Sequence, residues 1–271
     1  MASFAVGGVR LTRVPYFDVT LDADIIGFDA TRAAGIPWGV PDWATPDGRV
    51  LVGQAVWVVE SDTRTVAVDP CGAADAFLRS GPEAIGHQTA VAAALTAAGF
   101  PVGMVDSVVL SHLDGIGMAA AVDTEGAWRP FFPNARVVMS QDELSHVVAH
   151  PEIGGAVALR HLIDQGVVEG VDPPWEVAPG VALELTGGHS PGHCVVRVGE
   201  DAVLVGHLAI NPLQVGAGVI RGQHLDDEAA RSALERELAW ASERGALVIG
   251  PLWPAPGAGR VTGPPWVVSA A

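Results

Sequence analysis

The chain has 271 residues, of which 49% are hydrophobic, and a formal net charge of −16 at pH 7. This length and apolar content are those of a globular protein with one large α/β domain or two small ones. All 15 basic residues are arginines, and no basic stripe is present to neutralise phosphates, which argues against nucleic acid and anionic membranes as partners. No apolar run reaches the roughly 18 residues of a membrane span, and the N-terminus lacks a secretion-signal pattern. We therefore expect a soluble cytoplasmic protein.

The first half of the chain alternates apolar runs with turn residues. Residues 1–49 are rich in Pro, Gly and Asp and are expected to form an arm with short strands. Apolar runs predict strands, and an alanine-rich stretch and a capped stretch predict helices. The strands are expected at 50–59, 65–69, 105–110 and 136–139, and the helices at 89–98 and 140–150. Ser140 and Glu143 have the spacing of a capping box at the start of the second helix.

The second half repeats this rhythm. Strands are predicted at 181–185, 195–198, 202–205 and 246–249, and an amphipathic helix at 226–244. Strands followed by helices in each half predict two packed sheets with helices outside. Because no low-complexity linker separates the halves, we expect a single domain over residues 1–271.

Three of the nine histidines directly follow apolar strands: His112, His189 and His207. Strand ends hold side chains on rigid backbone, so they often carry ligand-binding groups. Imidazole is a common metal ligand, and Asp114 adds a carboxylate two residues after His112. The spacing alone is a weak signal, because a histidine at a strand end is more often a structural residue that makes hydrogen bonds.

Several segments from about residue 50 onward carry a family resemblance. They are "VVLSHLDG", "WRPFFPNARVVMSQDEL", "VAPGVALELTGGHSPGHCVVRV", "VLVGHLAINPLQV" and "LVIGPLWPAPGAGRV". In order and spacing they resemble the metallo-β-lactamase superfamily, most closely methyl-parathion-hydrolase-like enzymes and acyl-homoserine-lactone lactonases. The resemblance implies an αββα four-layer sandwich with the site at one edge of the two sheets. Residues 1–49 would then form an N-terminal arm covering the pocket.

The metal ligands of that family carry over unevenly. Where the family has H-x-H-x-D-H, this chain has His112, Asp114, Ile116 and Gly117. The next family histidine matches His189. His207 stands at the position of the aspartate that bridges two metals in the family, and Leu252 stands at the position of the last histidine. The resemblance therefore implies that the second metal site is lost at Ile116, Gly117 and Leu252. The first site keeps four groups that can bind a metal: His112, Asp114, His189 and His207. They could hold one Zn or Fe ion, and a site without metal is the alternative.

The resemblance leaves three functions open. The first is hydrolysis of a small ester, lactone or thioester with at most one metal ion. The second is a metal-independent lyase, isomerase or cyclase in which His112, Asp114, His189 and His207 act as acid–base groups in a drier pocket. The third is a pseudoenzyme without catalysis. The expected partner is a small-molecule substrate of bacterial metabolism, and a homodimer is left open because relatives are often dimers.

The segment Gly188–Gly192 spells G-x-S-x-G, the pattern of a serine nucleophile elbow. Pro191 follows the serine and has no N–H to stabilise an oxyanion, so Ser190 is interpreted as a turn residue. In the family, His193 and the position of Asp69 are mostly structural, and Asn211 could line the pocket.

The remaining candidates receive ordinary interpretations. Cys194 is expected to be a buried strand thiol, and Cys71 to lie in a turn. Trp38, Trp43, Trp57 and Trp253 are candidates for either the pocket or the core. The other histidines, His87 and His224 among them, are given no functional role.

Overall fold

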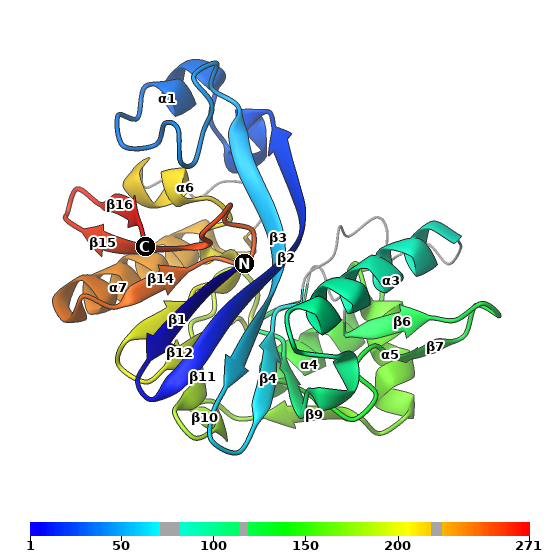
Figure 1. Cartoon of the computed structure of the whole chain (residues 1–271). Coiled ribbons are helices and arrows are strands. Elements are labelled where there is room, and N and C mark those ends of the chain that lie inside the picture. Colours follow the sequence, from blue (N-terminus) through cyan, green and yellow to red (C-terminus); the bar gives the residue numbers. More distant parts are fainter. Residues whose placement is uncertain (71–81, 114–118, 218–223) are drawn as a thin grey trace.

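The computed structural model describes residues 1–70, 82–113, 119–217 and 224–271. Two large sheets occupy the middle of the molecule, and helices cover their outer faces (Figure 1). The helices α3 (Pro82–Ala97), α4 (Gln141–Ala149) and α5 (Ala156–Asp164) pack on one sheet, and α7 (Asp227–Arg244) packs on the other. The predicted αββα sandwich is confirmed.

The first sheet has seven strands in the order β1-β2-β3-β4-β5-β8-β9. Their bounds are β1 Ala2–Val6, β2 Val9–Leu21, β3 Val50–Glu60, β4 Thr65–Val68, β5 Ser107–Val109, β8 Arg136–Ser140 and β9 Val168–Val171. Strands β4, β5, β8 and β9 run parallel, and the first three are short and mostly buried, as is typical of strands inside a parallel sheet. Their carboxyl ends meet at one edge of the sheet, where Asp69, His112 and Glu143 follow β4, β5 and β8.

The second sheet also has seven strands, in the order β10-β11-β12-β13-β14-β15-β16. Their bounds are β10 Trp175–Ala178, β11 Val181–Leu185, β12 Cys194–Val198, β13 Ala202–Leu204, β14 Leu247–Ile249, β15 Ala258–Thr262 and β16 Val267–Ala270. The β12–β13 pair is antiparallel, as the hairpin predicted across residues 199–201 requires. His189 lies in the connection between β11 and β12, and His207 follows β13.

The N-terminal region departs from the expectation of short strands. Strand β2 has 13 residues and pairs with β3 from Arg10–Glu60 to Leu21–Val50. Pro15 interrupts the sequence pattern, and proline inside a run normally argues against a strand. The register shift between Pro15 and Phe17 accommodates the proline, so the strand continues through it. The two long strands extend to the segment that carries the 3-10 helix η1 (Ala23–Ile26) and helix α1 (Ala30–Ala34) (Figure 1).

Helix boundaries follow their caps. The Ser140 hydroxyl accepts a hydrogen bond from the Glu143 N–H at 3.1 Å, as the capping box predicts for α4. Asp226 caps α7 in the same way. Helix α3 begins at Pro82, seven residues before the predicted start, and it therefore includes His87. Local sequence patterns did not predict α5, α6 (Pro212–Ala217), β9, β10, β15, β16 or the small sheet of β6 (Ala120–Val122) and β7 (Trp128–Pro130).

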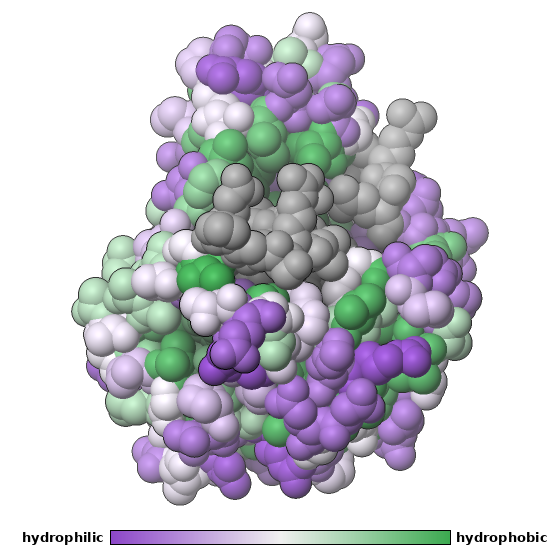
Figure 2. Space-filling view, turned by 90° about the vertical axis from the view of Figure 1, so that its right-hand side faces the viewer, coloured by the Kyte–Doolittle hydropathy of each residue, from purple (hydrophilic) through white to green (hydrophobic). Residues whose placement is uncertain are grey.

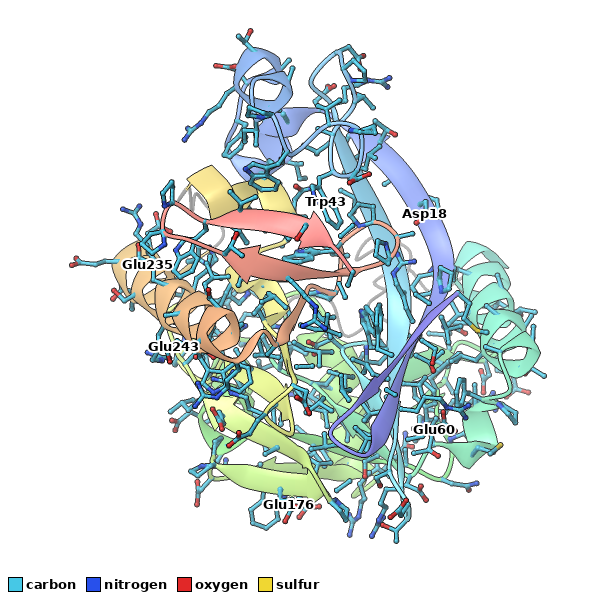
Figure 3. All side chains as sticks on the ribbon, turned by 60° about the vertical axis from the view of Figure 1, so that its left-hand side comes forward. Asp18, Trp43, Glu60, Glu176, Glu235 and Glu243 are labelled. Atoms are coloured by element: carbon cyan, nitrogen blue, oxygen red, sulfur yellow. The ribbon has the colours of Figure 1, made fainter. Side chains whose placement is uncertain are left out.

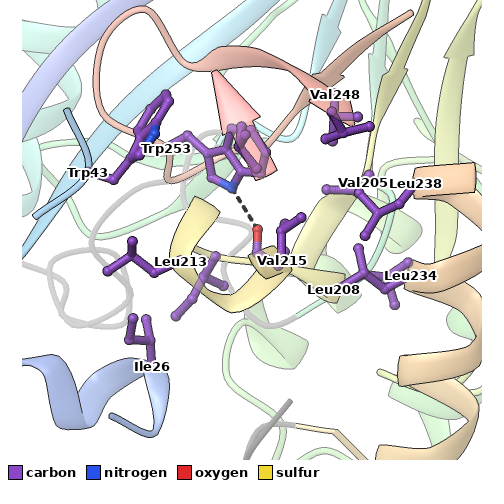
Figure 4. Packing of buried hydrophobic residues seen from close by; sticks show 14 of the residues in the cluster. Ile26, Trp43, Val205, Leu208, Leu213, Val215, Leu234, Leu238, Val248 and Trp253 are labelled. Carbon is purple, nitrogen blue, oxygen red and sulfur yellow. Dashed lines mark hydrogen bonds between the residues drawn. The ribbon is translucent and has the colours of Figure 1, made fainter. Parts of the chain in front are cut away.

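The core has three parts. Side chains such as Trp57, Leu183 and Ile249 pack between the two sheets. A second cluster lies under α3, α4 and α5. A third lies under α7 and includes Trp43 and Trp253 (Figure 4).

Polar and apolar residues are interspersed on the face shown in Figure 2. Several of the acidic side chains that give the chain its negative charge lie at the periphery, Glu176, Glu235 and Glu243 among them (Figure 3). Within the described part of the chain, no helix is both long and apolar enough to cross a membrane.

Candidate metal centre

The structure brings three of the four predicted site residues together. One side-chain nitrogen from each of His112, His189 and His207 lies within 4.8 Å of the other two. The ring centroids are 4.2 Å apart for His112 and His207, 5.0 Å for His112 and His189, and 5.4 Å for His189 and His207. His112 and His189 are buried and His207 is half-buried. Asp114, Ile116 and Gly117 lie outside the described residues.

A buried hydrogen-bond chain fixes the orientation of His112. The Asp69 carboxylate, just after β4, accepts hydrogen bonds from the Ser111 N–H at 2.7 Å and from the Ser111 hydroxyl at 2.6 Å. The single hydroxyl hydrogen is thus directed at Asp69, so the Ser111 oxygen accepts from Nδ1 of His112, 2.7 Å away. His112 therefore carries its proton on Nδ1, and Nε2 keeps the lone pair that a metal needs.

Glu143 joins the two loops that carry His112 and His189. This side chain is 1% exposed. One carboxylate oxygen accepts from the Leu113 N–H at 2.8 Å, and the other accepts from the Ser190 hydroxyl at 2.5 Å and the Gly192 N–H at 3.2 Å. From the sequence, Glu143 is expected only in a helix cap. Its main role in the structure is to hold the loop after β5 against the loop after β11.

Ser190 is buried and donates its hydroxyl hydrogen to Glu143. A hydroxyl that donates to a carboxylate in a turn fits the interpretation of Ser190 as a turn residue and not a nucleophile.

Cys194 is also buried, and burial raises the pKa of its thiol to about 12. Its Sγ lies 3.4 Å from the Gly192 carbonyl, and Cys194 is not among the residues that cluster for a metal.

The ring of His193 lies next to two rings of the three-histidine cluster. Its ring lies 5.5 Å from that of His112 and 5.4 Å from that of His189, and its Nδ1 is 2.6 Å from the Thr186 hydroxyl. Gly206 has a φ of +55°, and a Cβ there would lie 2.5 Å from Nε2 of His193. Only glycine lets the backbone before His207 pass this close to a ring.

Leu252 and Trp253 belong to the apolar core. Leu252 packs against the cluster under α7, and its carbonyl accepts from the Gly53 N–H at 3.0 Å. Trp253 is fully buried, contacts Trp43 edge-on with centroids 6.0 Å apart, and donates to the Ala209 carbonyl at 2.9 Å (Figure 4). These two tryptophans are therefore core residues.

Asn211 has a structural role. It is fully buried, its amide donates to the Leu51 carbonyl at 3.0 Å, and its oxygen accepts from the Leu213 N–H at 2.9 Å. These bonds tie the start of α6 to β3. Asn211 therefore does not line the pocket as expected, because the nitrogen and the oxygen of its amide both bind backbone groups.

One site residue was missed by the sequence analysis. Nδ1 of His224, in the segment before α7, lies 3.1 Å from Nδ1 of His189. The two residues are 35 positions apart, and no local pattern connects them.

Three imidazoles at this separation fit a single metal ion. Zinc binds imidazole nitrogen at about 2.0–2.1 Å, which places tetrahedral ligand atoms about 3.3 Å apart. Ligand atoms within 4.8 Å of one another reach that spacing with a small closure of the rings. Neutral imidazole is also the ligand type that zinc and ferrous iron accept. The described residues thus supply three of the ligands that one such ion requires.

The fold is that of the metallo-β-lactamase superfamily, and known structures with it align along nearly the whole chain. The hydrolase AbOPH of the β-lactamase superfamily is 18% identical, with 99% of this chain and 96% of that chain covered and a TM-score of 0.77. AidC, a dizinc quorum-quenching lactonase, is 17% identical, with 100% and 97% covered and a TM-score of 0.76. A probable metal-dependent hydrolase from Staphylococcus aureus is 15% identical, with 95% and 94% covered and a TM-score of 0.69.

No protein-family model and no curated protein matches the sequence. At 15–18% identity these structural likenesses establish the fold. The fold agrees with the resemblance in the sequence motifs.

Proposed function

We propose that this protein is a hydrolase of the metallo-β-lactamase fold that acts on a small ester, lactone or thioester with one divalent metal ion. The observation that carries the proposal is the convergence of His112, His189 and His207 within 4.8 Å at the edge of the two sheets. Zinc or ferrous iron is the proposed ion, and Asp114 is the fourth ligand proposed from the sequence. The lactone class is suggested by AidC, a dizinc lactonase of the same fold.

The residues of this chain would contribute in distinct ways. A divalent ion bound at this position would supply Lewis acidity for a substrate carbonyl and for a water molecule. His112 would bind through Nε2, because its Nδ1 is held by Ser111. Glu143 keeps the His112 and His189 loops in register, and Gly206 lets His207 approach from the second sheet. The fixed geometry reduces the reorganisation needed during reaction.

The chain should hold fewer ions than AidC. The sequence replaces the second group of family ligands by Ile116, Gly117 and Leu252, none of which can bind a metal. Leu252 packs against the apolar cluster under α7. A single ion is therefore the proposed stoichiometry.

The test is metal analysis of untagged protein purified without chelators, combined with an activity screen. We expect close to one zinc or iron per chain by inductively coupled plasma mass spectrometry, and loss of that metal in His189→Ala and His207→Ala. Hydrolysis of a panel of lactones and aryl esters should follow the metal content. His150→Ala, which removes an exposed histidine that caps the C-terminus of α4 and pairs with Glu152, should leave both unchanged.

Two results would overturn the proposal. One is a metal-free protein that converts its substrate at full rate. The other is a product without oxygen from ¹⁸O-labelled water. Either result would favour the metal-independent alternative, in which the same histidines move protons in an elimination, isomerisation or cyclisation.

A further inference from the structure

A histidine outside the three-histidine cluster contacts it directly. The His224 ring stands edge-on to that of His189, with centroids 5.2 Å apart and an interplanar angle of 79°. Nδ1 of one ring lies 3.1 Å from Nδ1 of the other, within hydrogen-bonding distance. One of these two nitrogens must donate and the other must accept.

The backbone fixes this contact. The Leu225 N–H donates to the His189 carbonyl at 3.0 Å, and the Asp226 N–H donates to the Gly188 carbonyl at 3.0 Å. Gly188 has a φ of +86°, and a Cβ there would clash with the Ala230 nitrogen in α7. The segment before α7 is therefore attached to the His189 loop by two backbone bonds and close packing. His224 is held in place by its own main chain rather than by its side chain alone.

The direction of the bond follows from the proposed metal site, on which this inference rests. Since Nδ1 of His189 faces His224, Nε2 is the nitrogen left for a metal in the cluster. Nε2 must then be unprotonated, so Nδ1 carries the hydrogen and donates it. We infer that His224 is the positioning residue of His189: it accepts this hydrogen bond and thereby fixes both the ring orientation and the tautomer of a metal ligand.

The same principle operates at His112 through a different group. There the Ser111 oxygen accepts from Nδ1, and the serine is itself held by the Asp69 carboxylate. Each buried histidine of the cluster thus has a partner on its Nδ1 that leaves Nε2 for the metal. The partner of His112 comes from its own sheet, whereas the partner of His189 comes from the entry to α7.

Zinc affinity tests the inference directly. Loss of such an orienting partner weakens metal binding by about 10–100-fold. We therefore expect His224→Ala to raise the dissociation constant for zinc by that factor, as measured by competition with a chromophoric chelator. His224→Asn keeps an acceptor oxygen near the position of Nδ1 and should recover most of the affinity. His150→Ala, which removes an exposed histidine paired with Glu152, is the matched control and should bind zinc like the parent.

A second readout needs no metal. In metal-free protein, the long-range ¹H–¹⁵N NMR spectrum should show His189 with its proton on Nδ1. In His224→Ala the same ring should become a mixture of tautomers, while His112 keeps its Nδ1 proton. Thermal melting of each variant checks that the fold is retained, and His224→Asn covers the case in which the alanine variant does not fold.

The outcomes separate the two proposals. A parent protein that binds no zinc, but shows the His189 tautomer and its loss in His224→Ala, would overturn the metal site and leave the positioning role standing. Zinc binding that is unaffected by both His224 substitutions would overturn the positioning role and leave the metal site standing. An Nε2-protonated His189 in the parent protein would overturn the positioning role as well.

Discussion

The Glu143 carboxylate accepts the hydroxyl hydrogen of Ser190 at 2.5 Å, across 47 residues of sequence and from the other sheet's loop. The same side chain accepts two backbone N–H groups and is 1% exposed. A buried carboxylate with three donors thus links the two loops that carry His112 and His189.

Replacement of this carboxylate should therefore destabilise the protein. In Glu143→Gln, one acceptor oxygen becomes an NH₂ group that faces donors, and an unsatisfied buried polar group costs about 1–3 kcal/mol. We expect a loss of that size in the free energy of unfolding, measured in urea, together with weaker zinc binding. Asp142→Asn removes an exposed charge from the neighbouring position on α4 and should change neither quantity appreciably. Equal stability of the two variants would contradict the assigned role of Glu143.

The Asp69–Ser111–His112 chain gives a prediction about metal affinity. Asp69→Asn tolerates the positive φ of 38° at this position, but its amide cannot accept from both Ser111 donors. The Ser111 hydroxyl then loses its fixed direction and His112 its preferred tautomer, so zinc should bind about 10–100-fold more weakly. Asp106→Asn is the control, because Asp106 accepts from the Thr65 N–H at the opposite end of β5. Isothermal titration with zinc measures both, and a parallel loss of affinity in the two variants would contradict the proposed chain.

A comparison of Gly206 with Gly126 separates two costs of adding a side chain: the strain of a left-handed backbone and the clash of the added Cβ with its neighbours. An L-residue with left-handed backbone costs about 1–2 kcal/mol, and Gly206 adds a clash at 2.5 Å with His193 and 2.8 Å with Ser111. Gly126 also has a positive φ, of +84°, but a Cβ added there would meet nothing within 4 Å. We expect Gly206→Ala to lose clearly more stability than Gly126→Ala and to lose zinc binding as well. Chemical denaturation and metal analysis of both variants provide the comparison.

Cys194 gives a prediction about pH. Burial raises the pKa of its thiol from 9.0 to about 12, so at pH 8 the native thiol stays protonated and should not react with iodoacetamide in a Cys71→Ser background. The unfolded thiol ionises near pH 9.0 while the native thiol does not, so the folded state binds more protons between these two pKa values. The free energy of unfolding should therefore fall as the pH rises from about 9 toward 12. Cys194→Ala in the same background should lack the part of this fall in the free energy of unfolding that the thiol causes. Rapid labelling of the native thiol at pH 8 would contradict the prediction.

Local sequence signals predicted most of the secondary structure near the site. Strand β11 has the predicted bounds Val181–Leu185, α4 begins after Ser140, and α7 begins after Asp226. These features depend on side-chain periodicity and capping groups within a few residues, which the sequence displays directly. The length of strand β2 was underestimated, because Pro15 breaks the sequence pattern of a strand. The strand continues past Pro15 because it pairs with β3.

The sequence by itself determined which residue types stand at the strand ends, and hence that His112, His189 and His207 were candidates for one site. It did not determine how close they come, because that distance depends on how two sheets pack. Only the tertiary structure placed Glu143 against Ser190 and His224 against His189, contacts that span 47 and 35 residues. Such contacts arise where loops from different strands meet, and no periodicity along the chain encodes them. The chemistry available to the site was therefore visible in the residues, while its geometry was decided by the packing of the two halves.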